Sequence, residues 1–140
     1  MKAYGPSRST TASPERVWSV WSDPTKWSRW NSGIRSATID GLLVMGATGT
    51  METNRGSKHA VTFTDVDPPR RFTMRMAGPP LTTFSFICEV TPDGTGSTIA
   101  QRVAVSGPLA FIFGPMMGPM MASHFVPVLD DLAGAAEAAP

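Results

Sequence analysis

Three polar side chains in the sequence have chemistry that could act on a bound molecule: His59, Gln101 and His124. A histidine can donate or accept a proton near neutral pH, and a glutamine amide can orient a polar group of a substrate. In the alternative, purely structural interpretation, each of these groups is buried and satisfied by a backbone carbonyl or a neighbouring side chain. The three residues are far apart in the chain, so only the fold could bring any of them together.

The sequence predicts neither a metal site nor a cofactor. Cys88 is the only cysteine, so it can form no internal disulfide and no cysteine cluster. The two histidines are far apart and no acidic motif accompanies them at metal-ligand spacing. The glycines show no phosphate-loop spacing, and the carboxylates Asp65, Asp67 and Glu89 are interpreted as turn and surface groups.

The middle of the chain, residues 34–106, has the alternating pattern of β-strands. The clearest segments are 58–64, 71–76, 83–90 and 98–105, and two weaker ones at 35–40 and 46–54 precede them. Proline- and glycine-rich turns separate them. Consecutive short strands of this kind predict an antiparallel meander with one dry face and one wet face. Gln101 falls on the apolar face of its strand, where its amide needs a partner: His124, a ligand oxygen or a water.

Two short helices are expected before the strands. Ser13 suits the N-cap and Pro14 the first helical position of a helix that ends near Asp23. A second short helix follows, carrying Trp27 and Trp30 three residues apart. In the first helix Val17, Trp18 and Trp21 lie at helical spacing.

A long helix is expected near the C-terminus. Met117, Met121, His124, Val128 and Leu132 recur at intervals of three and four residues, which is the spacing of one helical face. An apolar stripe of this length must be buried, and the dry face of the sheet is the available surface. His124 is therefore predicted to point toward the sheet.

Prolines and glycines interrupt this last segment. Pro127 has no N–H to donate to the carbonyl of Ser123, so a kink is expected at Pro127. Residues 109–118 are expected to form a semi-independent flap, either a mobile lid over a cavity mouth or a static plug of the core. The alanine-rich end, residues 133–140, is expected to fray.

Composition limits the class of protein. The chain has 140 residues, a net charge of +1 and 16% charged residues, and it contains no basic patch, which argues against a nucleic-acid partner. No apolar stretch runs uninterrupted for the length of a membrane-spanning helix, and no signal peptide is recognisable. We therefore expect one cytoplasmic domain, 1–140. The sequence does not indicate an oligomeric state.

Several motifs resemble those of one known family, and they occur in that family's order along nearly the whole chain. The resemblance is to the polyketide cyclase/dehydratase branch of the START-like (SRPBCC) superfamily. It rests on Ala12-Ser13-Pro14-Glu15-Arg16-Val17-Trp18, on Ser22-Asp23-Pro24 followed by Trp27, Trp30 and Asn31, on residues 46–51, on Val66-Asp67-Pro68-Pro69-Arg70-Arg71-Phe72, and on Ser106-Gly107-Pro108-Leu109 before the long helix.

The resemblance implies an α+β helix-grip fold. A curved seven-stranded antiparallel sheet would wrap around the long C-terminal helix, with the two short helices after a first strand near residues 2–10. Members of the superfamily bind lipids, sterols, polyketides, quinones or plant hormones in an internal cavity. Some are cyclases or dehydratases, but none of the shared motifs is catalytic, so the resemblance predicts fold more strongly than chemistry.

Three functional hypotheses remain open. The first is a carrier that encloses a small apolar ligand without catalysis. The second is a cyclase or dehydratase in which His124 moves a proton and Gln101 orients the substrate. The third is a protein-interaction or co-chaperone-like module. The methionines among the inward-facing residues would suit a ligand surface and core packing equally well. The predicted cavity residues are Trp27, Trp30, Met51, His59, Val61, Phe63, Phe72, Met74, Met76, Phe84, Phe86, Val103, Phe113, Met117, Met120, Met121 and His124.

Overall fold

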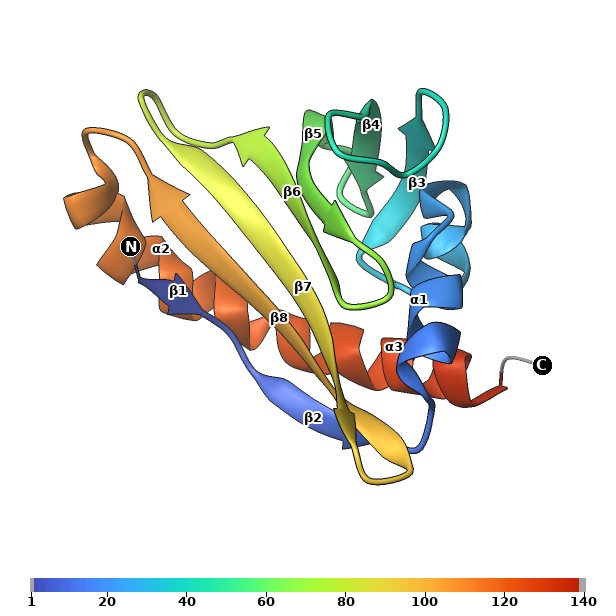
Figure 1. The fold of residues 1–140 in the computed structure, drawn as a ribbon. Helices are drawn as coiled ribbons and strands as arrows, with labels where there is room; N and C mark the ends of the chain where they lie inside the picture. Colours follow the sequence, from blue (N-terminus) through green and yellow to red (C-terminus); the bar gives the residue numbers. More distant parts are fainter. Residues whose placement is uncertain (1, 139–140) are drawn as a thin grey trace.

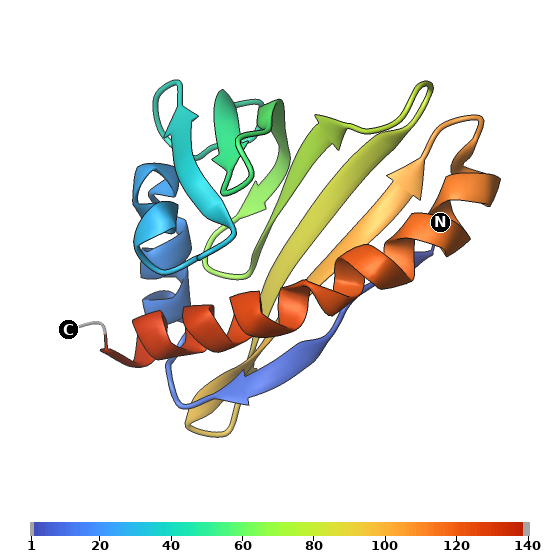
Figure 2. The ribbon, with the colours of Figure 1, turned by 180° about the vertical axis from the view of Figure 1, so that it is seen from behind.

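The alternating segments form a curved antiparallel sheet, and the C-terminal helices lie across its concave face (Figures 1 and 2). The computed structural model describes residues 2–138. Its elements are β1 Ala3–Tyr4, β2 Ser7–Thr10, α1 Pro14–Trp21, η1 Pro24–Arg29, β3 Ile34–Ile39, β4 Thr48–Thr53, β5 Lys58–Asp67, β6 Arg71–Ala77, β7 Thr83–Asp93, β8 Gly96–Ser106, α2 Ala110–Ser123 and α3 Phe125–Ala138. The predicted helix-grip fold is confirmed.

The strands follow one another as a meander. Their spatial order is β1-β8-β7-β6-β5-β4-β3, and β2 also pairs with β8. The single N-terminal strand that was expected is split in two, because Gly5 and Pro6 interrupt the pairing with β8. A side chain at Gly5 would overlap the backbone carbonyl of Gln101. Only a glycine at this position therefore allows the chain to lie so close to β8.

The concave face of the sheet is the dry one, as the alternation predicts. On β5, Val61 and Phe63 are buried while Thr64 is exposed. The same alternation continues through the neighbouring strands, so that one face of each strand contributes to a common core. Its buried members on these strands are Val61, Phe63, Phe72, Met74, Met76, Phe84, Cys88, Val90, Ile99, Val103 and Val105.

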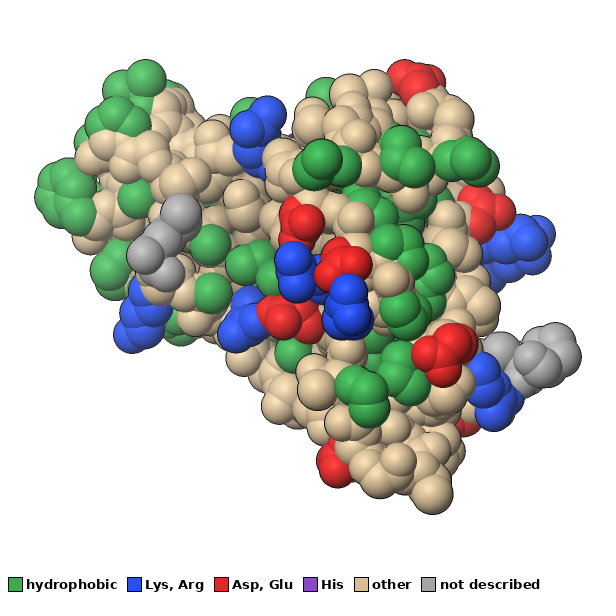
Figure 3. Space-filling model, in the orientation of Figure 1, with side chains coloured by type: hydrophobic (Ala, Val, Ile, Leu, Met, Phe, Trp, Pro, Cys, Tyr) green, Lys and Arg blue, Asp and Glu red, His purple; other side chains and the backbone are tan. Residues whose placement is uncertain are grey.

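The convex face carries ion pairs. Arg71 Nε lies 2.7 Å from Asp65 Oδ2, and Arg70 Nε lies 3.0 Å from Asp67 Oδ2. The hydrogen bond from Arg70 holds the pKa of the Asp67 carboxyl below its ordinary value. Figure 3 shows charged side chains of both signs gathered over the middle of this face. The site must therefore be sought on the opposite, concave face.

The two short helices begin where the capping residues predict. Ser13 Oγ accepts a hydrogen bond of 3.2 Å from the N–H of Arg16, and Asp23 caps η1 by accepting from the N–H of Thr25 at 3.1 Å. The hydrogen bond from the hydroxyl of Thr25 also lowers the pKa of Asp23. The caps fix where the aromatic residues of the helices enter the core; η1 is a 3-10 helix rather than an α-helix.

The long C-terminal helix is bent by 40° between α2 and α3. The bend lies at His124 and not at Pro127, where it was predicted. The prediction was wrong because Pro127 is the third residue of α3, and the first N–H groups of a helix have no acceptor within the helix in any case. Within residues 2–138 no single helix is long and apolar enough to cross a membrane; the bent pair α2 and α3 passes that test by length and composition alone.

Two further expectations about this region are corrected. Residues 109–118 are not a separate flap, because α2 runs without a break from Ala110 through Pro115 and Pro119 to Ser123. The end of the chain does not fray from residue 133, since α3 continues to Ala138 with Ala136 fully buried. Residues 139 and 140 lie outside the described residues. The end of α3 is held by Glu137, which accepts a 2.7 Å hydrogen bond from the hydroxyl of Thr10.

Candidate ligand-binding site

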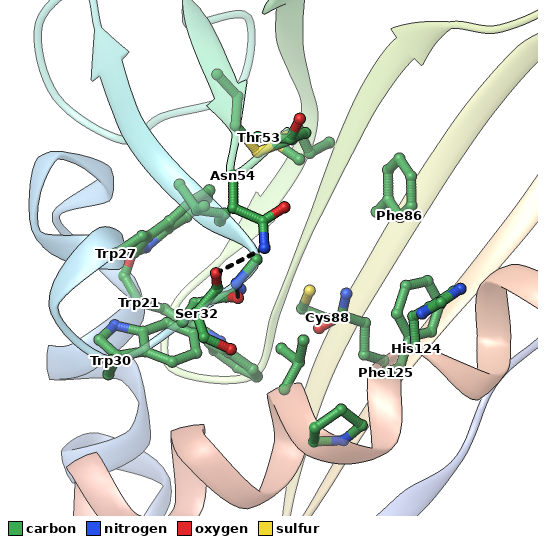
Figure 4. A pocket seen from close by; sticks show the side chains of 18 of the residues that line it. Trp21, Trp27, Trp30, Ser32, Thr53, Asn54, Phe86, Cys88, His124 and Phe125 are labelled. Atoms are coloured by element: carbon green, nitrogen blue, oxygen red, sulfur yellow. Dashed lines mark hydrogen bonds between the residues drawn. The ribbon is translucent and has the colours of Figure 1, made fainter. Parts of the chain in front are cut away.

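A cavity of about 530 Å³ lies between the concave face of the sheet, η1 and the start of α3 (Figure 4). It is the larger of two adjoining cavities under the sheet. Its wall comes from five parts of the chain that are distant in sequence: residues 21–34, 51–55, 72–88, 101 and 124–128. The lining residues are Trp21, Trp27, Trp30, Asn31, Ser32, Gly33, Ile34, Met51, Thr53, Asn54, Arg55, Phe72, Met74, Phe86, Cys88, Gln101, His124, Phe125, Pro127 and Val128.

Aromatic rings make two sides of this cavity. On one side, Trp21, Trp27 and Phe72 pack against one another, with Phe72 5.3 Å from Trp21 and 5.7 Å from Trp27 between ring centroids. Trp27 is fixed further by its indole N–H, which donates to the carbonyl of Trp21 at 3.0 Å. On the other side, Phe86 meets Phe125 of α3 at 6.0 Å. Both sides are thus rigid and apolar.

Cys88 and Gln101 are neighbours in the sheet floor of the cavity. They pair directly across β7 and β8, so their side chains leave the same face of the sheet. Burial raises the pKa of the Cys88 thiol to about 12, so this thiol stays protonated at neutral pH and is no nucleophile. The side-chain amide of Gln101 has no hydrogen-bond partner among residues 2–138. It is therefore free to bind a polar atom of a ligand.

The mouth of the cavity opens between two loops and α3. The Asn54 side chain donates to the carbonyl of Ser32 at 3.2 Å, which ties the β4–β5 turn to the loop before β3 (Figure 4). The backbone N–H of Asn54 adds a second bond, to the carbonyl of Gly33 at 3.0 Å. Arg55 follows on the same rim, and its guanidinium has no partner in the described part of the chain. It is a cation available at the cavity mouth.

His124 lies at the rim of the same cavity and is exposed. It was predicted on the apolar stripe of one long, kinked helix; instead α2 ends at Ser123 and His124 forms the turn before α3. Gln101 and His124 nevertheless line one cavity, so the structure brings the two candidate catalytic residues to the same site. Whether they act on a ligand stays a prediction.

His59 belongs to the second cavity, of about 430 Å³. It lies there with Met76, Phe84 and Met121, and so the two histidines are in separate cavities. Among residues 2–138 no group of three or more histidine, cysteine, aspartate or glutamate side chains could hold a metal ion. The second cavity shares three lining residues, Met51, Thr53 and Phe86, with the first.

The structure separates the predicted cavity residues into three groups. The first cavity takes Trp27, Trp30, Met51, Phe72, Met74, Phe86 and His124; the second takes Met51, His59, Met76, Phe84, Phe86 and Met121. Six predicted residues line neither. Val61, Phe63 and Val103 are closed into the core, Phe113 and Met117 pack against it from α2, and Met120 is 56% exposed on the outside of α2. The alternation of apolar and polar residues shows which face of a strand or helix points inward, but not which residues of that face line a cavity and which are packed into the core.

Sequence reasoning missed the residues of the mouth. Asn31, Ser32, Asn54 and Arg55 lie in loops, where no periodicity marks an inward side chain. The missed residues within regular elements did carry a signal, because helical or strand spacing places them beside residues that were predicted. Examples are Trp21, Cys88, Phe125 and Val128.

Comparison with known proteins identifies the family to which the sequence is similar. A family model described as polyketide cyclase / dehydrase and lipid transport matches residues 6–137. No curated protein matches the sequence.

Similar solved structures share the fold at low sequence identity. Ara h 8.0201 has a TM-score of 0.75 at 11% identity, with 97% of each chain covered. A truncated norcoclaurine synthase from Thalictrum flavum has a TM-score of 0.71 at 17% identity, covering 99% of this chain and 95% of its own. DynU16, from the dynemicin biosynthetic locus, has a TM-score of 0.75 at 16% identity, covering 99% of this chain and 48% of its own. Identities this low show a common fold only.

Proposed function

The chain belongs to the polyketide cyclase / dehydrase and lipid transport family, within the START-like superfamily, and on that premise we propose that it is a carrier for a small apolar molecule. The observation that supports this most is the cavity of about 530 Å³ with its two aromatic sides. Ligand pockets in proteins are typically ~300–1,000 Å³ and mostly apolar, with a few polar groups that fix orientation. Gln101 and Arg55 are such groups here.

The polar groups of the wall narrow the class of ligand. Gln101 has an uncommitted amide on the sheet floor, and Arg55 has an uncommitted cation at the mouth. Neither Asp nor Glu lines the cavity. The ligand that fits is an apolar body with a polar oxygen near Gln101 and an oxygen-rich or anionic end near Arg55. Lipids, polyketides and quinone-like molecules all meet this description.

The carrier proposal predicts different effects for the same substitution at two positions of α3. Val128 lines the cavity, whereas Val126 is 50% exposed to solvent on the same helix. Val128→Trp should fill the mouth and weaken binding of the apolar anion 1-anilinonaphthalene-8-sulfonate by roughly tenfold or more, because the probe loses the space it occupies. Val126→Trp should leave the affinity unchanged within about twofold. Fluorescence titration measures both.

Native mass spectrometry of protein purified from cells gives an independent result. We expect the wild type and Val126→Trp to retain a bound small molecule that is released on denaturation, and Val128→Trp to lack it. Circular dichroism establishes that both variants are folded. Equal probe affinities for the two variants, together with no retained mass in the wild type, would contradict the carrier proposal.

A second candidate is an enzyme of the cyclase or dehydratase type that uses the same cavity. It is favoured by one observation, that His124 and Gln101 line one cavity. His124 would take the proton from a methylene group between two ketones, and Gln101 would orient a ketone oxygen. With a linear poly-β-ketone thioester as substrate, His124→Ala should then lower turnover by about 100-fold or more. His59→Ala, in the other cavity, should leave turnover unchanged, and equal turnover in the wild type and His124→Ala would exclude this mechanism.

A further inference from the structure

Helix α2 packs on the protein through its smallest residues. Gly114 and Gly118 are buried, and they face Val105 of β8 and Tyr4 of β1. A Cβ atom added at Gly118 would overlap the ring of Tyr4. The helix therefore lies close against the edge of the sheet because these two positions have no side chain.

Phe113, Met117 and Met121 of α2 pack against the core, but the other large apolar side chains of this helix point away from the protein. Phe111 is 75% exposed, Met116 59% and Met120 56%. Ile112 lies on the same helical face, and Leu81 of the β6–β7 turn, 70% exposed, lies beside Gly107 at the start of the helix. We call these five residues, Leu81, Phe111, Ile112, Met116 and Met120, the apolar tip. Figure 3 shows hydrophobic side chains gathered over this end of the molecule.

The apolar tip carries no charge of its own. No Asp, Glu, Lys or Arg occurs between Arg102 and Asp130. A cation lies beside α2 at the sheet edge: Lys2 is exposed, with its ammonium 5.2 Å from the ring centroid of Tyr4, the ring that packs against α2. Lys2 has no ion pair in the described part of the chain. An apolar surface flanked by a cation without an ion-pair partner matches an anionic lipid surface.

Two backbone carbonyls of α2 lack a hydrogen-bond donor within the helix, so a surface that covers this face must leave them in contact with water. Pro115 and Pro119 have no N–H to donate to the carbonyls of Phe111 and Pro115, which lie on the exposed face. The hydroxyl of Ser123 is already bonded to the carbonyl of Met120 at 2.6 Å. A second copy of this face would bury those carbonyls without offering a donor, which is unfavourable. Water in a lipid headgroup layer can still hydrate them.

We propose that the apolar tip docks on the surface of an anionic lipid bilayer, with α2 lying in the headgroup layer and Lys2 near the lipid phosphates. Apolar side chains together with a neighbouring cation are the two components of interfacial binding. The docking surface is separate from the cavity, so it does not depend on the carrier role. It concerns lipid as a surface, not as a bound ligand.

Sedimentation with vesicles tests the docking, and the chain supplies a matched control. Leu42 and Met45, in the β3–β4 loop, are 81% and 71% exposed but belong to no apolar helix face. We expect the wild type to bind vesicles that contain phosphatidylglycerol more tightly than pure phosphatidylcholine vesicles. The double variant Phe111→Ser/Met116→Ser should lose roughly tenfold or more of its partition into the anionic vesicles. Leu42→Ser/Met45→Ser should stay within about twofold of the wild type.

Charge and oligomeric state are tested on the same proteins. Lys2→Glu should weaken binding to the anionic vesicles and leave binding to pure phosphatidylcholine unchanged. Thermal unfolding establishes that the variants are folded, as expected for substitutions of exposed side chains. Equal losses in the two double variants, or no binding of the wild type to anionic vesicles, would overturn the proposal. A wild-type dimer in size-exclusion chromatography that Phe111→Ser/Met116→Ser abolishes would also overturn it, by assigning the tip to a second copy.

Discussion

Replacing Phe72 with alanine should lower the free energy of unfolding by about 3–5 kcal/mol. Phe72 is only 2% exposed, and its ring contacts those of Trp18, Trp21, Trp27 and Phe63. Removing it deletes four aromatic contacts at once and leaves a void that rigid rings cannot close. Since the free energy of unfolding of a domain is only about 5–15 kcal/mol, this one substitution should remove a large part of it. Urea denaturation followed by tryptophan fluorescence measures it.

Phe72→Leu is the appropriate control, because it keeps most of the apolar volume and should cost less than about half as much. A substitution on the convex face, Thr73→Ala, should change stability by less than about 0.5 kcal/mol, since Thr73 is only partly buried on the other face of β6. If Phe72→Ala were no more destabilising than Phe72→Leu, the aromatic cluster would not be the rigid side of the cavity described above.

Gly107→Ala should be the other strongly destabilising substitution, with a loss of about 2–4 kcal/mol. Gly107 has a backbone φ angle of +111°, a conformation that residues other than glycine rarely adopt. A Cβ at this position would also overlap the backbone carbonyl of Leu81, and backbone cannot rotate away as a side chain could. Because Gly107 joins β8 to α2, the substitution should also loosen α2 from the sheet. Urea denaturation and hydrogen exchange of α2 measure the two effects.

Gly46→Ala separates the two causes. Gly46 has a φ of +90° but no atom within 4 Å of an added Cβ, so it carries the backbone strain without the overlap. We expect a loss of only about 1 kcal/mol there. Similar losses at Gly46 and Gly107 would mean that the loop before α2 moves to accept the side chain.

The sheet was predictable from the sequence because strand alternation is a local signal. Val61 and Phe63 were placed on the dry face by their spacing alone, and both are buried. The N-terminal strand was harder to predict from the sequence, since its pairing with β8 depends on contacts with residues about a hundred positions away. The bend of the last helix was expected at the wrong residue for a related reason: spacing showed that Pro127 interrupts a helix but not that a new helix begins at Phe125.

The candidate site was predictable only in part. The apolar residues of the wall follow from the same alternation, whereas the mouth depends on loop contacts such as the bond from Asn54 to Ser32. Met120 illustrates the converse error. It was predicted to line the cavity, but the glycines of α2 occupy the inward face and Met120 is 56% exposed on the outer one. A stripe of apolar residues has no preferred direction when the opposite face is apolar as well.

The residues shared by the two cavities determine how long a guest molecule the fold can accept. Met51, Thr53 and Phe86 line both cavities, so the two chambers adjoin at these three residues. Side-chain rotamers change far faster than strands or helices rearrange, and methionine changes shape more readily than other apolar residues. A compact guest fits in one chamber, while an elongated chain can extend into both once Met51 turns aside. We therefore expect selectivity for the length of a guest to depend on these side chains, and on Met51 in particular, more than on the width of the sheet.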